Sequence, residues 1–507
     1  MPTTFTHTDL PPAAAIDALE RAGFDVGTPR PVTRVVLDTF DGRLFAAGLR
    51  LEHRRDPEIA LVLRDRTDAP PARLVGATAP RWPSGLPAGP LRTRLAAITK
   101  ERALLPHLTA TSHVNRADRR DRRGKVTVTA EIHEGVQVDA CALPGWFLEL
   151  QGVAGHGDDH EQVTARLLSL GMTMEDGDLL TVVARATNRS LEGRSNAPTV
   201  PLEAAEPALS GYRRVLANLA DTIEANRPGT IDDIDEEFLH DLRVAVRRSR
   251  SVLAESDGVL PDEVRDPQRE AFGELGQQTG PARDLDVYVA GWDSYVDPLG
   301  LSGDPGLDKV RGEIERRRAA AHEELSKVLE SDDCRAMIER WRLWLSDPAV
   351  PVDAGQLLGP IVAKRIEKAQ KKLLRDGRAI TSASPGERLH DLRKDAKKLR
   401  YLLECFGSLF PADQRKAFVS QLKDLQDNLG EHQDAEVHLA QLRDLAHDLH
   451  ERAVVDTDAL LAMGRLSDQL ERRRAEERAA FAKRFSQYDR KSNRKVLARM
   501  LEVVRDP

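Results

Sequence analysis

Two short segments of the chain combine one histidine with a row of basic residues. Phe238–Leu253 reads FLHDLRVAVRRSRSVL, and Arg388–Leu403 reads RLHDLRKDAKKLRYLL. In the first segment, the polar side chains recur at three- and four-residue steps, which place them on one face of an α-helix. This face carries His240, Arg243, Arg247 and Arg250. Guanidinium groups and a histidine can donate charge-assisted hydrogen bonds to an anion that offers only oxygen acceptors. The spacing therefore predicts a stripe that binds a polyanion.

The second segment is a repeat of the first. The letters LHDLR start at Leu239 and again 150 residues later at Leu389. The same offset pairs Leu275 with Leu425, Gly280 with Gly430, and Asp284 with Asp434. The second basic row consists of His390, Arg393, Lys394, Lys397, Lys398 and Arg400. Because Asp284 and Asp434 shortly follow a glycine, we expect them to cap a helix or to orient an arginine.

Other interpretations of these rows are a solvated basic face, a metal site and a phosphorylated histidine. A basic face alone could serve solubility, but both copies keep the histidine and three basic positions in register, which favours a binding site. A metal is not expected at His240 or His390, because neither has partner ligands at the usual spacing. Phosphorylation of these histidines is not expected, because no catalytic group accompanies them.

Further basic residues are weaker candidates for the same site. Arg214 and Lys364 occupy matching positions on the first helix of each copy. The clusters Arg316–Arg318 and Arg472–Arg474 also recur, and they fit a binding surface and a solvent-facing surface equally well.

The elements that would position these residues are helices. After about residue 200, apolar residues follow the helical period, as in Leu209, Tyr212, Leu216, Leu219 and Ile223. Each copy is long enough for several helices. The repeat therefore predicts an all-α region of two four-helix bundles related by a pseudo-twofold axis, with residues 208–355 in the first half and 356–507 in the second.

The first 190 residues predict a mixed α and β domain. The expected strands are Arg34–Asp38, Leu49–Arg55, Ile59–Arg64, Lys125–His133 and Trp146–Gln151. Asp56 and Pro57 predict a hairpin turn, Pro70–Pro90 an irregular loop, and Gln162–Leu170 a helix. Residues 191–207, rich in proline, glycine and small residues, predict a linker between the two domains.

Composition limits the possible functions. The net charge of −7 gives no overall attraction for polyanions, so an anion site must come from local clustering. Aromatic residues make up only 4% of the chain, which disfavours a protein that stacks on nucleic-acid bases. The three cysteines are widely spaced, and no secretion signal or long apolar run occurs, so a cytoplasmic protein is expected.

The helical region resembles the CHAD family, the conserved-histidine α-helical domain. The resemblance rests on the LHDLR pattern with its following arginines and on GPARDLDV (Gly280–Val287), with GEHQDAEV (Gly430–Val437) as a looser second copy in which Gln433 replaces Arg283. It implies two four-helix bundles around a basic channel, with inorganic polyphosphate as the partner. No cofactor, membrane or nucleic-acid partner is expected, and self-association is left open.

The first 190 residues resemble the CYTH family, a β tunnel that binds triphosphates. The resemblance rests on VVLDTFDGRLFAAGLRLEHRR (Val35–Arg55) and on LELQG (Leu148–Gly152). The family's E-x-E-x-K signature would supply metal-binding acids, but here the chain reads TFTHTDL, and Glu52 stands where a tunnel arginine is expected. Arg54 and Glu149 are either remnants of the tunnel or a charge pair at a strand edge. The resemblance thus implies a degenerate domain that does not hydrolyse triphosphate.

Three functions are compatible with the sequence. The first is non-enzymatic binding of inorganic polyphosphate, with targeting to polyphosphate granules. The second is triphosphate or polyphosphate hydrolysis by the N-terminal domain. The third is nucleic-acid binding by the basic helices.

Overall fold

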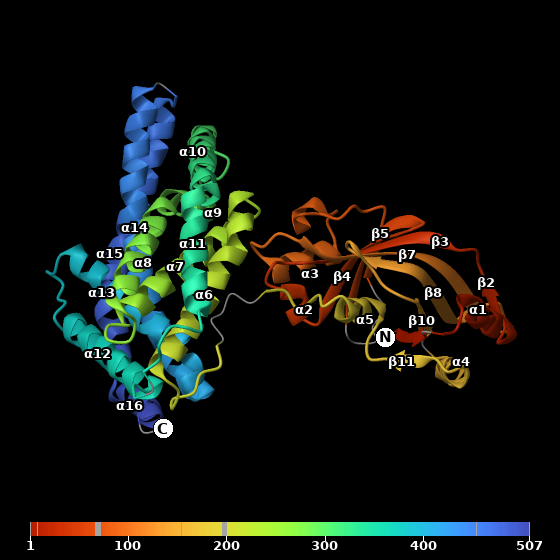
Figure 1. The fold of residues 1–507 in the computed structure, drawn as a ribbon. Coiled ribbons are helices and arrows are strands. Elements are labelled where there is room, and N and C mark those ends of the chain that lie inside the picture. Colours follow the sequence, from red (N-terminus) through yellow and green to blue (C-terminus); the bar gives the residue numbers. More distant parts are fainter. Residues whose placement is uncertain are drawn as a thin grey trace. The chain divides into compact units, whose positions relative to one another are not determined.

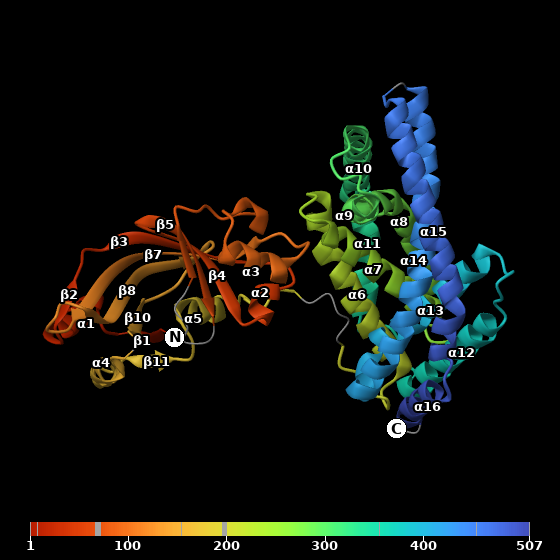
Figure 2. The same cartoon turned by 180° about the vertical axis from the view of Figure 1, so that it is seen from behind.

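The computed structural model describes residues 2–7, 9–65, 72–153, 155–194, 200–353, 355–452 and 454–505. The chain forms two compact units, Met1–Asn196 and Ala197–Pro507. Figures 1 and 2 show the elements of each unit from opposite sides. Of the linker predicted at 191–207, residues 195–199 lie outside the described residues.

The first unit is built on one antiparallel sheet. Its strands are β1 (Thr3–His7), β2 (Phe24–Val26), β3 (Arg30–Asp38), β4 (Leu49–Asp56), β5 (Glu58–Asp65), β6 (Ala72–Val75), β7 (Leu105–Arg120), β8 (Val126–Val138), β9 (Cys141–Ala142), β10 (Trp146–Gly152) and β11 (Thr173–Glu175). Its α-helices are α1 (Pro12–Arg21), α2 (Arg43–Ala46), α3 (Pro90–Thr99), α4 (Gly157–Ser169) and α5 (Leu179–Ala186). Among the described residues, strand pairing runs in the order β11-β1-β10-β8-β7-β3-β4-β5-β6, with β2 beside β7 and β9 beside β8.

Alternation along the strands gives the sheet two different faces. On one face, Phe5, Ile132 and Leu148 pack with α1 and α4 in an apolar layer. The opposite face carries charged residues of β3, β4, β8 and β10, and α5 packs against its apolar part, where Val36 and Phe147 lie. Figure 1 shows the strong curvature of β7 and β8.

The predicted strands and the helix after β10 are present, but two parts of the prediction are wrong. Pro70–Pro90 is not wholly irregular, because Ala72–Val75 pairs with β5 as β6. The longest strand, Leu105–Arg120, was not predicted, because its sequence LPHLTATSHVNRADRR does not alternate regularly between apolar and polar residues.

The described part of the second unit is built of helices, with one isolated β-bridge between Pro207 and Leu357. Its α-helices are α6 (Ala208–Ile231), α7 (Glu236–Ala254), α8 (Asp262–Gln278), α9 (Gly280–Val296), α10 (Pro305–Glu330), α11 (Asp332–Ser346), α12 (Leu358–Arg378), α13 (Gly386–Cys405), α14 (Ala412–Glu451), α15 (Thr457–Tyr488) and α16 (Lys491–Arg505). The fold is thus the one expected: an antiparallel sheet domain followed by an all-α domain.

The two copies of the repeat share an order of helices but differ at one point. The helices α6 and α7 correspond to α12 and α13, while α8 and α9 together correspond to the single helix α14. The break falls at Thr279, directly before Gly280 and Pro281, and Pro281 has no amide hydrogen to continue the helix ladder. Glu431 stands at the matching position of α14, so the second copy remains one helix.

The hydrophobic core of the helical unit belongs to both copies. One apolar cluster joins residues of α6 and α7 with residues of α12 and α13, including Leu216, Leu242, Ile366 and Leu399. A second cluster joins the ends of α9 and α10 with those of α14 and α15. The copies therefore stabilise each other across a shared interior. Within the described residues, no helix is both long and apolar enough to cross a membrane.

Candidate functional site

The two predicted basic rows lie on α7 and α13, and these helices pack against each other. Two ion pairs connect them. Arg248 on α7 lies 2.5 Å from Glu404, and Lys398 on α13 pairs with Glu255 just after α7. Arg248 and Lys398 are equivalent positions of the repeat, so the contacts obey an approximate twofold relation. This arrangement brings the two copies of the row to a common interface.

Basic residues from both copies meet at this interface. We define the basic cluster as Arg243 and Arg247 of α7 with Arg393, Lys397 and Arg400 of α13. Burial and the positive charges of Arg393, Arg247 and Arg400 lower the pKa of Lys397 to about 7. Burial and the charge of Arg247 likewise lower the pKa of Arg243 to about 10. The cluster is thus partly withdrawn from water and repels itself, and an anion between its members would relieve both effects.

Some donors of the basic cluster point at no acceptor. The Nε atoms of Arg247 and Arg393 are buried and, among the residues that the structure describes, have no hydrogen-bond partner. Buried polar groups are normally hydrogen-bonded, because a buried group without a partner loses its hydrogen bonds to water and gains none in the protein. The two donors therefore favour an oxygen-bearing ligand.

Contacts with the third helical segment of each copy orient two arginines of the basic cluster. Arg243 donates to the carbonyl oxygen of Gly276 over 3.0 Å and to Oγ1 of Thr279 over 2.7 Å. Arg393 donates to Oδ1 of Asp434 over 3.1 Å. The expectation that an aspartate after the glycine orients an arginine is confirmed for Asp434.

The expectation that these aspartates cap a helix is wrong. Asp434 lies in the middle of α14, and Thr279 rather than Asp284 precedes α9. Loss of hydration and the nearby charge of Asp434 raise the pKa of Asp284. The two acids therefore lie close enough to interact, each beside arginines of the basic cluster.

The two repeat histidines lie on the same helices as the rows. His240 is half-buried on α7, and His390 is half-buried on α13. Nδ1 of His390 lies 2.6 Å from Oε1 of Gln433, an amide oxygen that can only accept, so this nitrogen carries the proton. Gln433 thereby fixes the ring, and Nε2 of His390 keeps its capacity to bind a further group.

Several predicted site residues do not join the basic cluster. Lys394 pairs with Asp391 over 3.3 Å at an exposed position, and Lys398 is held by Glu255. Arg250 is exposed, and its guanidinium lies beside the glycines of α8. Of the first-helix candidates, Arg214 pairs with Glu206 and donates to the carbonyl oxygen of Pro201, while Lys364 is exposed on α12. Their roles in binding stay predictions.

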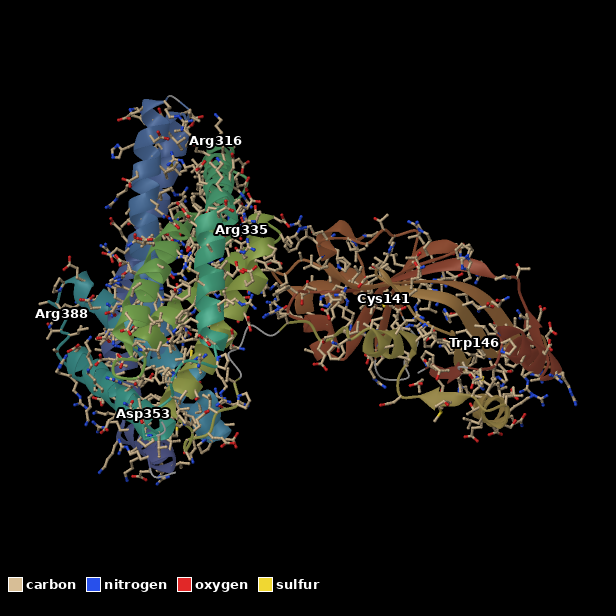
Figure 3. The ribbon with its side chains drawn as sticks, viewed as in Figure 1. Cys141, Trp146, Arg316, Arg335, Asp353 and Arg388 are labelled. Atoms are coloured by element: carbon tan, nitrogen blue, oxygen red, sulfur yellow. The ribbon has the colours of Figure 1, made fainter. Side chains whose placement is uncertain are left out.

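The arginine clusters on α10 and α15 divide between solvent and interior. Arg316, labelled in Figure 3, and Arg472 have side-chain exposures of 60% and 74%. Arg318 instead binds Asp286 and Asp233, each over 2.7 Å. Only part of each cluster therefore fits the solvent-facing interpretation.

The contacts of Arg318 belong to a network that sequence inspection did not single out. His322 Nε2 lies 2.9 Å from Oδ1 of the same buried Asp286. These contacts connect α10 to α9 and to the segment between α6 and α7. The repeat could have indicated Asp286, because the equivalent residue of the second copy, Glu436, is also acidic.

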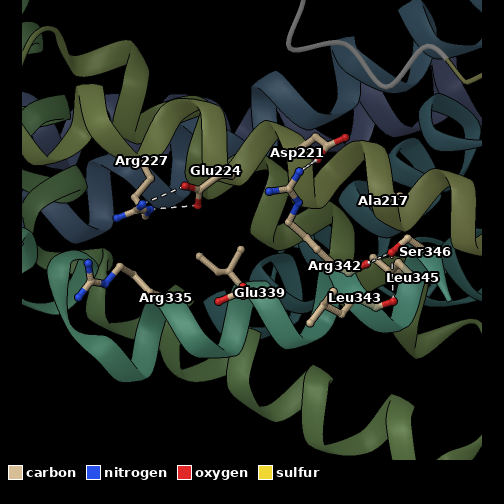
Figure 4. Close-up of a pocket in the computed structure, with 11 residues that line it drawn as sticks. Ala217, Asp221, Glu224, Arg227, Arg335, Glu339, Arg342, Leu343, Leu345 and Ser346 are labelled. Carbon is tan, nitrogen blue, oxygen red and sulfur yellow. Dashed lines mark hydrogen bonds and ion pairs between the residues drawn. The ribbon is translucent and has the colours of Figure 1, made fainter.

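A separate cavity in the helical unit lies away from the basic cluster. It measures about 620 Å³ and lies between α6 and α11 (Figure 4). Its lining arginines are ion-paired: Arg227 with Glu224 over 2.9 Å, Arg342 with Asp221 over 2.9 Å, and Arg335 with Asp332. Its mixed charges do not favour a polyanion.

The interior face of the sheet unit carries a network of ion pairs. Arg34 binds Glu52 over 3.0 Å and Glu149 over 2.6 Å, and all three side chains are buried. Arg54 binds Glu131 over 2.8 Å and Asp56 over 2.6 Å. Although burial opposes ionisation, the charge of Arg34 holds the pKa of Glu149 well below its usual range.

Arg54 and Glu149 are therefore not a charge pair at a strand edge. Their strands, β4 and β10, lie inside the sheet order, and each side chain binds a different partner. The edge-pair interpretation is wrong because β8, β7 and β3 separate the two strands in the sheet order, and both residues line a cavity on the interior face.

Comparison with known proteins defines the helical unit. Residues 214–443 match the CHAD domain family. This part of the chain is a CHAD domain, and the antiparallel sheet domain before it is consistent with the CYTH resemblance.

Solved structures with some similarity include the CHAD domain from the plant Ricinus communis. It is 26% identical, over 57% of this chain and 95% of that one, with a TM-score of 0.48. PptA from Streptomyces chartreusis is 16% identical over 55% of this chain and 99% of that one, with a TM-score of 0.45. The PH1819 protein from Pyrococcus horikoshii OT3 is 10% identical over 37% and 98%, with a TM-score of 0.25. No curated protein matches the chain significantly.

Proposed function

We propose that the CHAD domain binds inorganic polyphosphate at the basic cluster and catalyses no reaction there. The observation that carries the proposal is the meeting of Arg247 and Lys397, equivalent residues of the two copies, among Arg243, Arg393 and Arg400. A row of this kind suits a chain of phosphates, because every phosphate offers oxygen acceptors and negative charge but no base edge.

The strength of binding should depend strongly on salt. A linear polyanion carries a layer of condensed counterions, and each phosphate neutralised by a lysine or arginine releases some of them. Affinity therefore falls as the salt concentration rises, and the slope reports the number of charged contacts. Nucleic acid could use the same basic cluster, so competition between RNA and polyphosphate distinguishes this alternative.

The direct test reverses four charges of the basic cluster. We expect the variant Arg243→Glu, Arg247→Glu, Arg393→Glu and Lys397→Glu to lose retention on immobilised polyphosphate while keeping its helical circular-dichroism spectrum. Each position then repels the ligand instead of attracting it.

A matched control reverses four exposed cations outside the basic cluster: Lys327, Arg335, Lys371 and Arg375. This variant carries the same change in net charge and should still bind. Equal loss in both variants would show that binding follows overall charge rather than the basic cluster.

We also propose that the protein associates with polyphosphate granules through this site. A fluorescent fusion of the full chain should mark the granules, and the four-charge variant should be dispersed. Granule localisation that survives the charge reversal would assign targeting to another part of the chain.

For the sheet domain we propose that it does not hydrolyse triphosphate with magnesium or manganese. Strand β1 carries Thr4 and Thr6 where the resemblance implies acids, and Arg34 and Arg54 already occupy Glu149 and Glu131. A phosphate-release assay of the full chain with triphosphate and Mg²⁺ or Mn²⁺ should show no turnover. Release that disappears in a Glu149→Gln variant would establish the second candidate function, a triphosphatase.

A further inference from the structure

The first and last helices of each copy pack together, and the two pairs differ in charge. The pair in the first copy is α6 with α11, and the equivalent pair in the second copy is α12 with α16 (Figures 1 and 2). The helices α12 and α16 contain twelve lysines and arginines and three acids. The helices α6 and α11 contain six arginines and five acids. The packing of such a pair therefore does not require an excess of cations, and the excess in the second copy favours a binding role.

On α12 the cations form one exposed row. They recur at steps of three and four residues, which keep them on one face of the helix. The row consists of Lys364, Lys368, Lys371, Arg375 and Arg378. The buried apolar residues, among them Ile366 and Leu373, lie on the opposite face. The row therefore points away from the core, along about 21 Å of helix at 1.5 Å per residue.

A second exposed row follows α16. It consists of Lys491, Lys495 and Arg499, at four-residue steps. The two helices are antiparallel, because Gly359 at the start of α12 lies beside Val504 at the end of α16. Arg505 and Glu367, both partly exposed, form an ion pair between the helices over 2.6 Å. This pair lies on the outer side of the helices, so the two rows share that side.

Several cations of the two rows have no partner in the protein. The nearby acids are already bound: Glu367 pairs with Lys371 and Arg505, and Asp489 pairs with two arginines. The cations whose side chains form no ion pair or hydrogen bond within the described ranges are Lys364, Lys368, Lys491, Lys495 and Arg499. In the first copy, by contrast, the arginines lining the cavity between α6 and α11 are ion-paired.

A polymer with two rows of phosphates fits this face. Packed helices have axes about 8–10 Å apart, so the two cationic rows have a similar separation. Double-stranded DNA carries one row of phosphates on each side of a minor groove about 6 Å wide. Lysine and arginine side chains at this spacing can reach both strands. Inorganic polyphosphate has a single row of phosphates, so one chain of it would use only one of the two helices.

Single-stranded nucleic acid and membranes fit the face less well. The helices α12 and α16 contain no aromatic residue on which an unpaired base could stack. Their apolar residues are packed in the core, apart from the exposed Val503. A basic surface attaches stably to a bilayer only together with a second, inserted group.

We propose that the outer face of α12 and α16 binds the backbone of double-stranded DNA, independently of base sequence. The site is separate from the basic cluster and does not depend on polyphosphate binding there. The scarcity of aromatic residues opposes base stacking, but it does not oppose contacts to phosphates.

The test measures binding of the full chain to a fluorescently labelled 20-base-pair DNA duplex by anisotropy, across a salt series. Two duplexes of unrelated sequence should bind equally. If all five unpartnered cations contact phosphates, the slope of log affinity against log salt should be about −4.5. The variant Lys368→Glu, Lys491→Glu, Lys495→Glu and Arg499→Glu removes four contacts. Its slope should be smaller by about 3.6, and its affinity at 50 mM salt should fall more than tenfold.

A matched control reverses four exposed cations of the first copy: Lys327, Arg335, Arg340 and Arg342. This control should bind the duplex as tightly as a protein with the same net charge and an intact α12–α16 face. Both variants should keep the helical circular-dichroism spectrum. If the first variant does not fold, the milder Lys368→Gln and Lys495→Gln protein should still lower the slope by about two.

Four results would overturn the proposal. The wild-type chain could fail to bind the duplex at 50 mM salt, or the two charge-reversal variants could lose equal affinity. Loss of polyphosphate retention with unchanged duplex binding would assign the face to polyphosphate. Cosedimentation with phosphatidylserine vesicles, without duplex binding, would assign it to a membrane.

Discussion

At the scale of single residues, Lys397 is the most informative side chain of the basic cluster. Its ammonium group is surrounded by Arg393 and Arg400 on its own helix and by Arg247 on α7, with Asp434 of α14 as the nearby acid. The pKa of Lys397 falls to about 7 because burial and these arginines disfavour its charged form. A bound phosphate would favour the charged form again.

This environment predicts a pH dependence of polyphosphate binding. Above pH 7 the free protein must take up a proton at Lys397 when the anion binds, so affinity should fall as pH rises, by at most about tenfold per pH unit. Because Arg stays charged, Lys397→Arg should flatten the profile between pH 7 and 9. Calorimetry in two buffers of different ionisation enthalpy measures the proton uptake. Identical pH profiles for the two proteins would contradict the assignment.

The stability of the free protein changes in the opposite direction. The folded-state pKa of Lys397 lies below its unfolded value, so the unfolded chain binds more protons above pH 7. The free energy of unfolding therefore rises with pH through that window. Both effects have the same origin, the unfavourable charge at Lys397.

The residues of the basic cluster could be predicted from the sequence. Which of the predicted cations join the cluster, and which pair with acids instead, could not. Helical spacing places His390, Arg393, Lys397 and Arg400 on one face, and repetition indicates that this face matters. It could not show that Lys398 is held by Glu255, because that contact depends on how two helices pack. Side-chain partners from another helix are set by the tertiary fold and have no local signature.

At the scale of elements, glycines set how closely the helices approach. A Cβ atom added at Gly377 of α12 would lie 2.0 Å from Cε2 of Phe485 on α15. Gly464, in the same helix as Phe485, has no atom within 4 Å of such a Cβ among the described residues. The first glycine is required by packing, and the second is not.

These two glycines predict opposite effects of alanine. Gly377→Ala should lower the free energy of unfolding by about 1–3 kcal/mol, because the ring of Phe485 must move within a packed core. Gly464→Ala should raise it by about 0.5–1 kcal/mol, because alanine favours the helix and meets no neighbour. Urea unfolding followed by circular dichroism measures both. A Gly377→Ala protein as stable as the wild type would show that the α12–α15 contact is loose.

The elements themselves were predictable where their pattern is strong. The repeat and the helical period gave the all-α region, and the strands β3, β4, β5, β8 and β10 follow from apolar and β-branched runs. The strand Leu105–Arg120 could not be predicted because it is rich in polar residues. Its buried and exposed positions follow no regular alternation. Sheet neighbours stabilise this strand more than its own sequence does.

At the scale of the whole molecule, charge is divided unevenly. The chain carries a net charge of −7, yet cations gather where α7 meets α13. Local fields at close range determine binding, and the distant acids are screened within about a Debye length, roughly 8 Å at physiological ionic strength.

The helical unit alone should therefore retain the binding site. Residues 197–507 form a compact unit with its own core, so this fragment should bind polyphosphate as the full chain does, with the same slope against salt. Binding measured across a salt series compares the two proteins, with circular dichroism as the control for folding. A folded fragment with a markedly smaller slope would place some of the phosphate contacts in the sheet unit.

The approximate twofold relation between α7 and α13 bears on the direction in which a ligand can lie. Arg248 and Lys398, equivalent residues of the two copies, each pair with an acid at the end of the other helix, so these contacts are approximately preserved by a half-turn. Linear polyphosphate also reads the same from either end, whereas a nucleic-acid strand has a 5′ and a 3′ terminus. A polymer with two identical ends can bind such a surface in either orientation with nearly equal energy. Twice as many encounters between polymer and surface then lead to binding.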